Sequence, residues 1–209
     1  MKKATLIILS LFIFDCTFGQ SLEKNFRQID LEEKIGNRTL KDYLLDEKIP
    51  QFFKDIFQQK QNISDNDETF ALLDSLFSTD MERHPFYFVL VTRITWWSDG
   101  AVSEVLGGTV KEYVETNTQQ FLDYFSTESV LTTFDFERWA GHTLGEIHID
   151  SEDNVEQEIE NTKRLMKENC VSCSPKKIKM IDKFIKCMYE QNEDLIKQNE
   201  DYLKQKENE

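Results

Sequence analysis

The sequence has few of the residues that interrupt regular secondary structure. Its 209 residues include 7 glycines and 3 prolines, about 5% of the chain where soluble proteins average about 12%. β-Sandwiches and β-barrels need many tight turns, so this shortage disfavours them and excludes a collagen-like chain. The 16 phenylalanines can fill a substantial core, which excludes wholesale disorder.

Long apolar runs are also missing. The apolar run at residues 4–14 is broken only by Thr5 and Ser10 and follows Lys2 and Lys3, and it is shorter than the roughly 20 residues needed to cross a bilayer. A basic head, a short apolar stretch and small residues before position 20 are typical of a secretory signal peptide. We therefore expect residues 1–19 to be removed and the mature protein to be exported, periplasmic or extracellular, without integral membrane association.

Basic residues are outnumbered by acidic ones. The chain has 25 Lys and Arg against 39 Asp and Glu, a net charge of −14. Nucleic acids and anionic bilayers are polyanions that repel such a chain, so neither is expected to be its main partner. The charge favours a basic protein as partner.

The apolar residues that are present recur every three or four positions, which predicts a succession of amphipathic helices. Residues 86–97 are apolar on all sides and suit a buried strand or a buried helix. We favour the helix because the segment follows Pro85 and lies among helical patterns. Residues 36–53 also resemble residues 107–122, as repeated helical hairpins would. The predicted fold is all-α, either a multi-helix bundle or a short α-solenoid of helical hairpins.

The predicted organisation is a signal peptide (1–19), a helical globular domain (20–189) and a polar helical tail (190–209). Heptad spacing from Ile178 to Tyr202 in the long C-terminal helix is compatible with a homodimer through residues 178–202. The favoured alternative is that its apolar half packs on the parent domain, because Asn192 and Asn199 weaken the seam.

Three cysteines remain after residue 19. In an oxidising compartment we expect a disulfide between Cys170 and Cys173, since Cys187 lies about 20 Å along a straight helix from that turn. The CxxC motif closes a helix where a thioredoxin-type motif opens one, and no second ligand pair completes a zinc site. A structural disulfide with one remaining thiol is the favoured interpretation.

Two groups of residues are candidates for chemistry. His142 and Glu146 share a helix face and could bind a metal ion together, although an ordinary i, i+4 contact is the favoured interpretation. The second group could line a ligand or partner pocket and comprises Arg93, Trp96, Trp97, Asp99, Glu104 and Trp139. In that group, a buried Arg93 needs a carboxylate partner, for which Asp74, Asp99 and Glu104 are candidates.

Catalytic signatures are absent from the sequence, which has no G-x-S-x-G, P-loop, G-x-G-x-x-G or H-E-x-x-H motif. Our first hypothesis is an exported, non-enzymatic helical protein that binds another protein and needs no cofactor, in concrete form a periplasmic immunity-type protein. The alternatives are a metal-dependent hydrolase that uses His142 and Glu146, and a small-ligand-binding helical module around the tryptophans.

Overall fold

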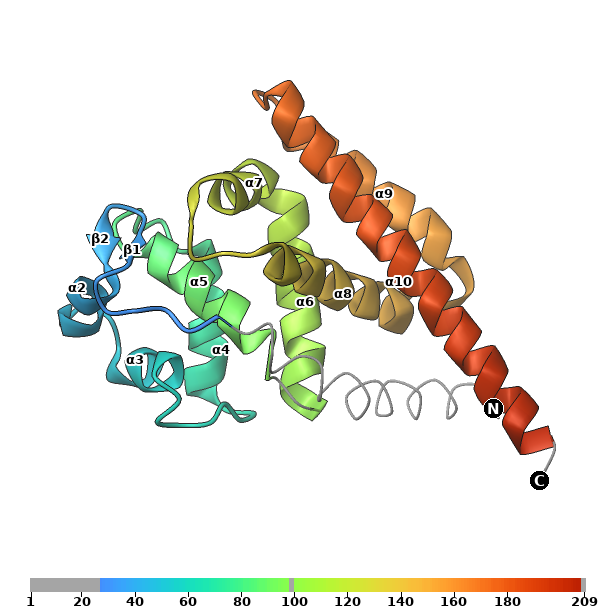
Figure 1. Ribbon diagram of the computed structural model, residues 1–209, viewed down its shortest axis with the longest axis horizontal. Coiled ribbons are helices and arrows are strands. Elements are labelled where there is room, and N and C mark those ends of the chain that lie inside the picture. Colours follow the sequence, from blue (N-terminus) through green and yellow to red (C-terminus); the bar gives the residue numbers. More distant parts are fainter. Residues whose placement is uncertain (1–26, 98–99, 208–209) are drawn as a thin grey trace. The chain divides into compact units, whose positions relative to one another are not determined.

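The computed structural model describes residues 27–97 and 100–207. Within these ranges the chain forms nine α-helices, two 3₁₀ helices and one two-stranded sheet (Figure 1). The elements are β1 (Lys34–Ile35), β2 (Arg38–Thr39), α2 (Leu40–Leu45), α3 (Gln51–Phe57), α4 (Asp67–Asp74), η1 (Ser75–Phe77), α5 (His84–Ile94), α6 (Gly100–Thr116), α7 (Thr118–Thr127), α8 (Thr133–Asp150), η2 (Glu152–Asn154), α9 (Val155–Glu168) and α10 (Pro175–Glu207). This all-α multi-helix bundle confirms the predicted class, and α5 confirms a helix in the segment that also suited a strand.

Local side-chain chemistry sets where several helices begin. Thr39 and Thr132 each accept a hydrogen bond from the backbone N–H three residues later, and the carboxylates of Asp42 and Asp135 bond back to the N–H groups of the capping threonines. Asn66 caps α4 by accepting the Thr69 N–H. Because the first N–H groups of a helix have no partner inside it, these caps fix the helix starts.

The short sheet depends on a glycine. Lys34 of β1 pairs with Thr39 of β2, and Gly36 between the strands has a φ of +62°. A Cβ at Gly36 would also lie 3.0 Å from the Pro85 ring. The Gly36 N–H donates to Glu128 Oε2 at 2.7 Å. Both the backbone conformation and the close approach therefore require glycine here.

The resemblance between residues 36–53 and 107–122 does not mark a structural repeat. Gly36 lies in the turn between the strands and Thr39 caps α2, whereas Gly107 and Thr109 lie inside α6. Of the two predicted architectures, the bundle is the one that the structure has.

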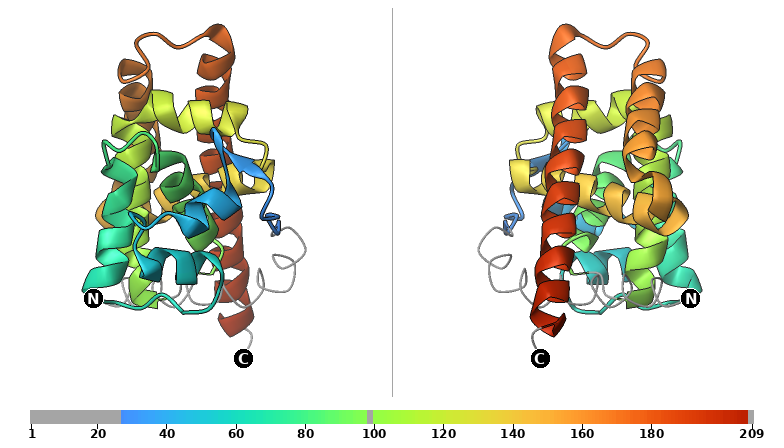
Figure 2. Two further views of the ribbon diagram at one scale, coloured as in Figure 1. Left: turned by 90° about the vertical axis from the view of Figure 1, so that its left-hand side faces the viewer. Right: turned by 90° about the vertical axis from the view of Figure 1, so that its right-hand side faces the viewer.

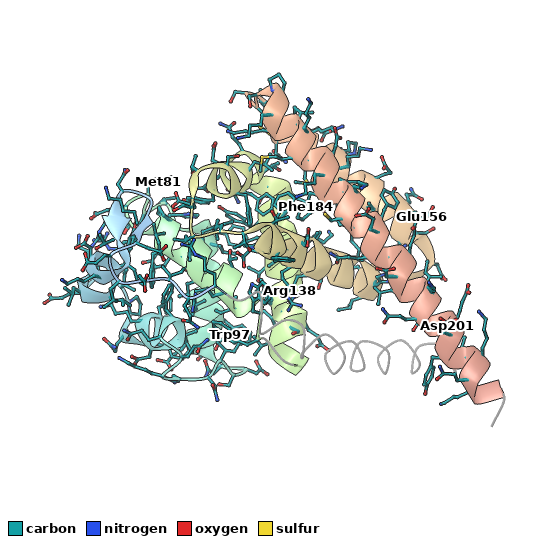
Figure 3. The ribbon with its side chains drawn as sticks, in the orientation of Figure 1. Met81, Trp97, Arg138, Glu156, Phe184 and Asp201 are labelled. Atoms are coloured by element: carbon teal, nitrogen blue, oxygen red, sulfur yellow. A yellow bond between two sulfur atoms is a disulfide. The ribbon has the colours of Figure 1, made fainter. Side chains whose placement is uncertain are left out.

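Aromatic rings from five helices form the part of the core around Trp139. Trp139 of α8 is fully buried and stacks on Phe88 of α5 with ring centroids 5.0 Å apart. Tyr113 of α6 and Phe121 of α7 pack against the same indole at 5.9 and 5.2 Å. Phe184 of α10 reaches Phe121 at 5.4 Å (Figure 3). The abundant phenylalanines thus hold α5, α6, α7, α8 and the first half of α10 together.

Residues Ile29–Glu190 form one compact unit, and a second unit includes the chain from Gln191 onward. Within the compact unit, α9 and the first half of α10 are an antiparallel hairpin (Figure 2). The Tyr189 hydroxyl donates to Glu160, and Lys167 pairs with Asp182 at 3.1 Å. In the described part of the chain, no helix is both long enough and apolar enough to span a membrane. The predicted signal peptide, residues 1–19, lies outside the described residues.

Candidate functional site

The carbonyl that follows α5 is covered by donors from α8. Thr95 O accepts hydrogen bonds from Arg138 Nε at 2.9 Å and from Arg138 Nη2, and His142 Nε2 lies 3.1 Å away. A carbonyl only accepts, so His142 carries its proton on Nε2 and donates it to this contact. The last carbonyls of a helix lack partners within the helix. Arg138 and His142 therefore serve the structure by completing the end of α5.

The predicted metal pair, His142 and Glu146, contacts two different neighbours. Burial, with the charge of Arg138, lowers the pKa of His142 to about 4, so the ring is neutral at pH 7. Glu146 lies against α6, where its Oε2 is 2.9 Å from the position of a Cβ on Gly107. Among the described residues, no three His, Cys, Asp or Glu side chains are grouped so that they could hold a metal ion. Joint metal binding by His142 and Glu146 stays a prediction.

The tryptophans of the predicted pocket do not come together on one surface. Trp139 is buried in the core, where its Nε1 donates to Thr92 Oγ1 at 3.0 Å. Trp96 and Trp97 follow α5 and are only partly buried, and Trp96 Nε1 donates to Asp135 Oδ1 at 2.7 Å. The structure thus separates Trp139 from the other two, and the indole of Trp139 is not available to a ligand.

Arg93 is buried, as expected for an arginine in an apolar segment. Its guanidinium lies over the rings of Phe57 and Trp97, 4.6 and 5.7 Å from their centroids. Burial lowers the pKa of Arg93 to about 10, while the charge of Asp135 raises it. Asp135 was not among the carboxylates predicted to pair with Arg93, and Asp99, which was, lies outside the described residues.

The cysteines take the expected arrangement. A disulfide joins Cys170 and Cys173 in the turn between α9 and α10, and Cys187 is a buried free thiol. Burial raises the pKa of Cys187. Since the thiolate is the reactive form, a buried thiol with a raised pKa is a poor nucleophile. These contacts support a structural role for all three cysteines.

The first half of the predicted dimer seam is used inside the compact unit. Ile181, Ile185 and Met188 are buried there. Their packing on the parent domain is the arrangement favoured from the sequence. A homodimer through residues 178–202 stays a prediction, and these three side chains are not free to contribute to it.

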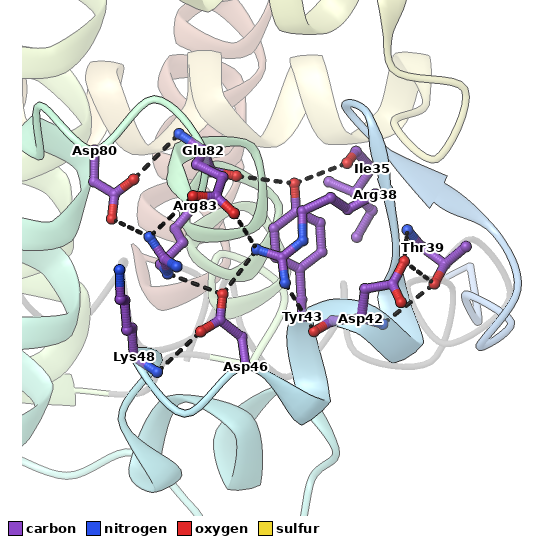
Figure 4. Close-up of polar contacts among 10 residues, drawn as sticks. All are labelled: Ile35, Arg38, Thr39, Asp42, Tyr43, Asp46, Lys48, Asp80, Glu82 and Arg83. Carbon is purple, nitrogen blue, oxygen red and sulfur yellow. Dashed lines mark hydrogen bonds and ion pairs between the residues drawn. The ribbon is translucent and has the colours of Figure 1, made fainter.

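An ion-pair network near the start of the described chain had no signal in the sequence (Figure 4). Asp46 Oδ2 lies 2.7 Å from Arg38 Nη1 and 2.9 Å from Arg83 Nε, and Arg83 also pairs with Asp80 at 2.7 Å. Burial raises the pKa of Asp46, but hydrogen bonds from Arg38, the Lys48 N–H and Arg83 outweigh it and lower the pKa to about 2. The network fastens α2 to the turn before α5.

A second polar group missed from the sequence is fully internal. His84 Nε2 lies 2.7 Å from Leu76 O and His84 Nδ1 lies 2.7 Å from the Tyr124 hydroxyl. The carbonyl requires Nε2 to be the donor, so Nδ1 accepts from Tyr124. Burial lowers the pKa of His84. With both ring nitrogens bonded to the protein and the side chain 1% exposed, His84 is a structural histidine.

Three carboxylates near the crossing of α6 and α8 differ from all these groups because none of them is paired within the described residues. Glu104 of α6 and Glu146 and Asp150 of α8 have no hydrogen-bond or ion-pair partner among the described residues. We call these three residues the acidic crossing. Burial raises the pKa of Glu146, and the charges of Asp150 and Glu104 add to it. Lys111 lowers that pKa but points its ammonium to Glu115, at 3.4 Å.

The acidic crossing follows from helix spacing and a glycine pair. Glu146 and Asp150 are four residues apart and share a face of α8. Gly107 and Gly108 leave room on α6 for the Glu146 side chain, since a Cβ on Gly108 would lie 3.4 Å from Glu146 Oε1. Only Glu104 and Glu146 of the acidic crossing were candidates from the sequence, and Asp150 could have been found from its spacing to Glu146.

The chain matches no protein-family model, no curated protein and no solved structure. The chemistry of its own residues is therefore the basis for a functional proposal.

Proposed function

We propose that this chain is an exported, non-enzymatic protein that binds a basic protein partner through the acidic crossing. The observation that carries the proposal is that Glu104, Glu146 and Asp150 gather without a direct ion pair among the described residues, since Lys111, the cation that acts on Glu146, is paired with Glu115. Elsewhere in the compact unit, Asp46, whose side chain is 9% exposed, is paired with two arginines. Carboxylates that repel one another cost folding free energy, which a Lys or Arg from a partner would recover.

Exposed apolar side chains that adjoin two of these carboxylates in the sequence favour a protein partner over a metal ion. Val105 follows Glu104 on α6 and is 38% exposed, and Ile149 precedes Asp150 on α8 and is 55% exposed. Protein interfaces combine a desolvated apolar part with charges at the rim. The described carboxylates are also not grouped as metal ligands. The mixed surface fits a partner that presents a basic side chain among apolar ones.

The net charge of −14 adds long-range attraction for such a partner. Opposite charges raise association rates and this effect weakens with salt. A concrete form of the proposal is an immunity-type protein that occludes a basic toxin in the periplasm. The predicted export signal, the acidic charge and the disulfide-closed helical body are compatible with this role.

Capture of partners by immobilised residues 20–209 tests the proposal. We expect a basic protein, from extracts of the source or of competing organisms, that elutes at moderate salt and is identified by mass spectrometry. Its affinity is then measured for E104Q/E146Q/D150N, with E47Q/E68Q/D74N as the control of equal charge. We expect at least about a tenfold loss for the first triple variant only, because close charge pairs dominate such couplings.

Two results would overturn the proposal. One is the absence of a basic partner at low salt from every extract. The other is an equal loss of affinity in both triple variants, which would show that net charge acts without the acidic crossing.

A further inference from the structure

The basic residues of the chain are concentrated in one segment. Residues 163–186, from the last turns of α9 to the middle of α10, contain eight Lys and Arg and two Asp and Glu, a net charge of +6. The remainder of the chain has a net charge of −20. Because salt screens charges beyond a Debye length of about 8 Å, a surface this basic acts on its own surroundings whatever the total charge is.

Intramolecular pairs neutralise one part of this segment. The side chains of Lys163, Arg164, Lys167 and Lys177 pair with acids at 2.5 to 3.2 Å. These four cations are therefore already satisfied within the compact unit. The lysines that remain all lie on α10.

The remaining four lysines form one stripe. Lys176, Lys179, Lys183 and Lys186 are all exposed, and at 100° per residue they fall within a sector of about 80° and span about 15 Å of the helix. Lys176 and Lys179 make no hydrogen bond or ion pair among the described residues. Lys183 lies over the Phe136 ring, and Lys186 pairs with Glu190 at the end of the row. We call these four residues the lysine stripe.

An exposed apolar side chain lies just before the lysine stripe. Val171 is 92% exposed, the largest value among the exposed apolar side chains of the described chain. It sits in the turn that the Cys170–Cys173 disulfide closes, where the Cys173 N–H donates to Cys170 O at 3.1 Å. The turn lies at the end of the α9–α10 hairpin from which α10 starts (Figure 2), and Val171 in this turn is exposed to solvent.

We propose that the α9–α10 hairpin docks on an anionic lipid surface through the lysine stripe and Val171. A row of ammonium groups on a straight helix can meet a plane of lipid phosphates simultaneously, and each lysine near such a surface adds to binding. An apolar side chain beside the cations enters the boundary between headgroups and acyl chains. Single-stranded nucleic acid is disfavoured because the stripe has no aromatic or arginine side chain for base stacking.

This inference is independent of the proposed protein partner, which uses α6 and α8. The test is co-sedimentation of residues 20–209, which lack the apolar leader, with vesicles of equal parts phosphatidylglycerol and phosphatidylcholine at low salt. Vesicles of phosphatidylcholine alone are the lipid control. We expect binding to the anionic vesicles only, and release as salt is raised.

Matched variants locate the binding surface. K176Q/K179Q/K183Q is expected to lower the vesicle partition coefficient by at least about tenfold, given the contribution of each lysine near an anionic surface. K34Q/K48Q/K60Q removes the same charge from exposed lysines elsewhere and is expected to bind as the parent does. V171S is expected to lower partitioning by about threefold, since less apolar surface is buried.

The proposal is overturned if the parent protein does not bind anionic vesicles at low salt, or if both triple variants lose binding equally. It is also overturned if the lysine stripe binds polyglutamate or single-stranded DNA more tightly than it binds the vesicles. Circular dichroism of each variant separates loss of binding from loss of fold.

Discussion

The N-terminal part of α8, residues 133–142, and its C-terminal part, residues 143–150, here called its first and second halves, differ in how their charged side chains are paired. In the first half, Arg138, Trp139 and His142 each direct a nitrogen to a partner on α5 or in the turn that follows it. In the second half, Glu146 and Asp150 have no partner in the described residues. Asp150 is exposed and Glu146 is partly buried, and an unpaired charge costs free energy only to the extent that it is buried. The first half of α8 thus serves the fold, and the second half carries two of the carboxylates to which we propose that a partner binds.

Replacing Trp139 should have the largest effect on the first half. Trp139→Ala removes an indole packed against Phe88 and Phe121, and we expect it to lower the free energy of unfolding by about 3 to 5 kcal/mol. Urea denaturation followed by circular dichroism measures the loss. The control, Phe134→Ala, lies in the first turn of α8 with 48% of the side chain exposed and should cost less than about 1 kcal/mol. Similar losses in both variants would contradict the described core.

Asp46 shows what a paired carboxylate contributes, in contrast to Glu146. Asp46→Asn keeps the shape but loses the charged hydrogen bond from Arg38 and the ion pair with Arg83, and should cost about 2 kcal/mol at pH 7. The pKa of Asp46 is lowered to about 2, so this stabilisation is present above the unfolded pKa of about 4 and is lost as pH falls toward 2. Urea denaturation of both proteins at pH 7, 4 and 2.5 measures the difference.

The difference in the free energy of unfolding between the parent and Asp46→Asn should therefore become smaller at acid pH. Asp65→Asn, at an exposed position, should match the parent throughout. A difference that is unchanged at pH 2.5 would show that the carboxylate is not the group responsible.

The pH dependence of stability that comes from His142 checks the described contacts in the first half of α8. Its pKa is lowered to about 4, so the neutral ring stabilises the fold fully above the unfolded value of about 6.5, and this contribution is lost as pH falls toward 4. His142→Gln keeps a donor without the titration. We expect the parent to lose about 2 kcal/mol relative to this variant between pH 7 and pH 4.5. An NMR titration that places the pKa of His142 near 6.5 would contradict the buried contact to Thr95.

The features that the sequence predicted are those encoded locally. Amphipathic spacing predicted the helices, including α5, and the spacing of Cys170 and Cys173 predicted their disulfide. The Asp46 network joins residues up to 45 positions apart in sequence around that carboxylate, and the pairing of Trp96 with Asp135 spans 39. No local pattern indicates such contacts, because they depend on how whole helices pack.

The net charge of the whole chain gave no indication of the lysine stripe. The composition indicated an acidic protein and disfavoured anionic surfaces as partners. Once α9 and α10 are seen as a hairpin, the basic residues at 163–186 divide into four that are paired with acids and the lysine stripe, in which only Lys186 has an ion pair. The net charge of the whole chain cannot show that basic residues are concentrated in one segment, whereas the net charge of successive segments along the sequence could have shown it.

Glu146 gives the smallest predicted effect, and it has the opposite sign to the others. Burial and two like charges raise its pKa, so the ionised form opposes folding. Glu146→Gln should therefore match the parent well below pH 4, where the carboxyl is protonated in both the folded and the unfolded state. The variant should become more stable than the parent as pH rises from the unfolded pKa of about 4.3 through the raised folded pKa. We expect a gain of about 0.5 kcal/mol at pH 7, the size of one like-charge pair on a helix.

Thermal unfolding at pH 4 and pH 7 measures this gain, with Glu112→Gln, an exposed position on α6, as the control. A loss of stability at pH 7 in Glu146→Gln would mean that the carboxylate is satisfied within the fold, and the contrast between the halves of α8 would fail. A gain in stability together with weaker binding of a basic partner would connect the two properties. The charge that costs the free protein stability would then be the charge that the partner neutralises, and the second half of α8 would be held unpaired for binding.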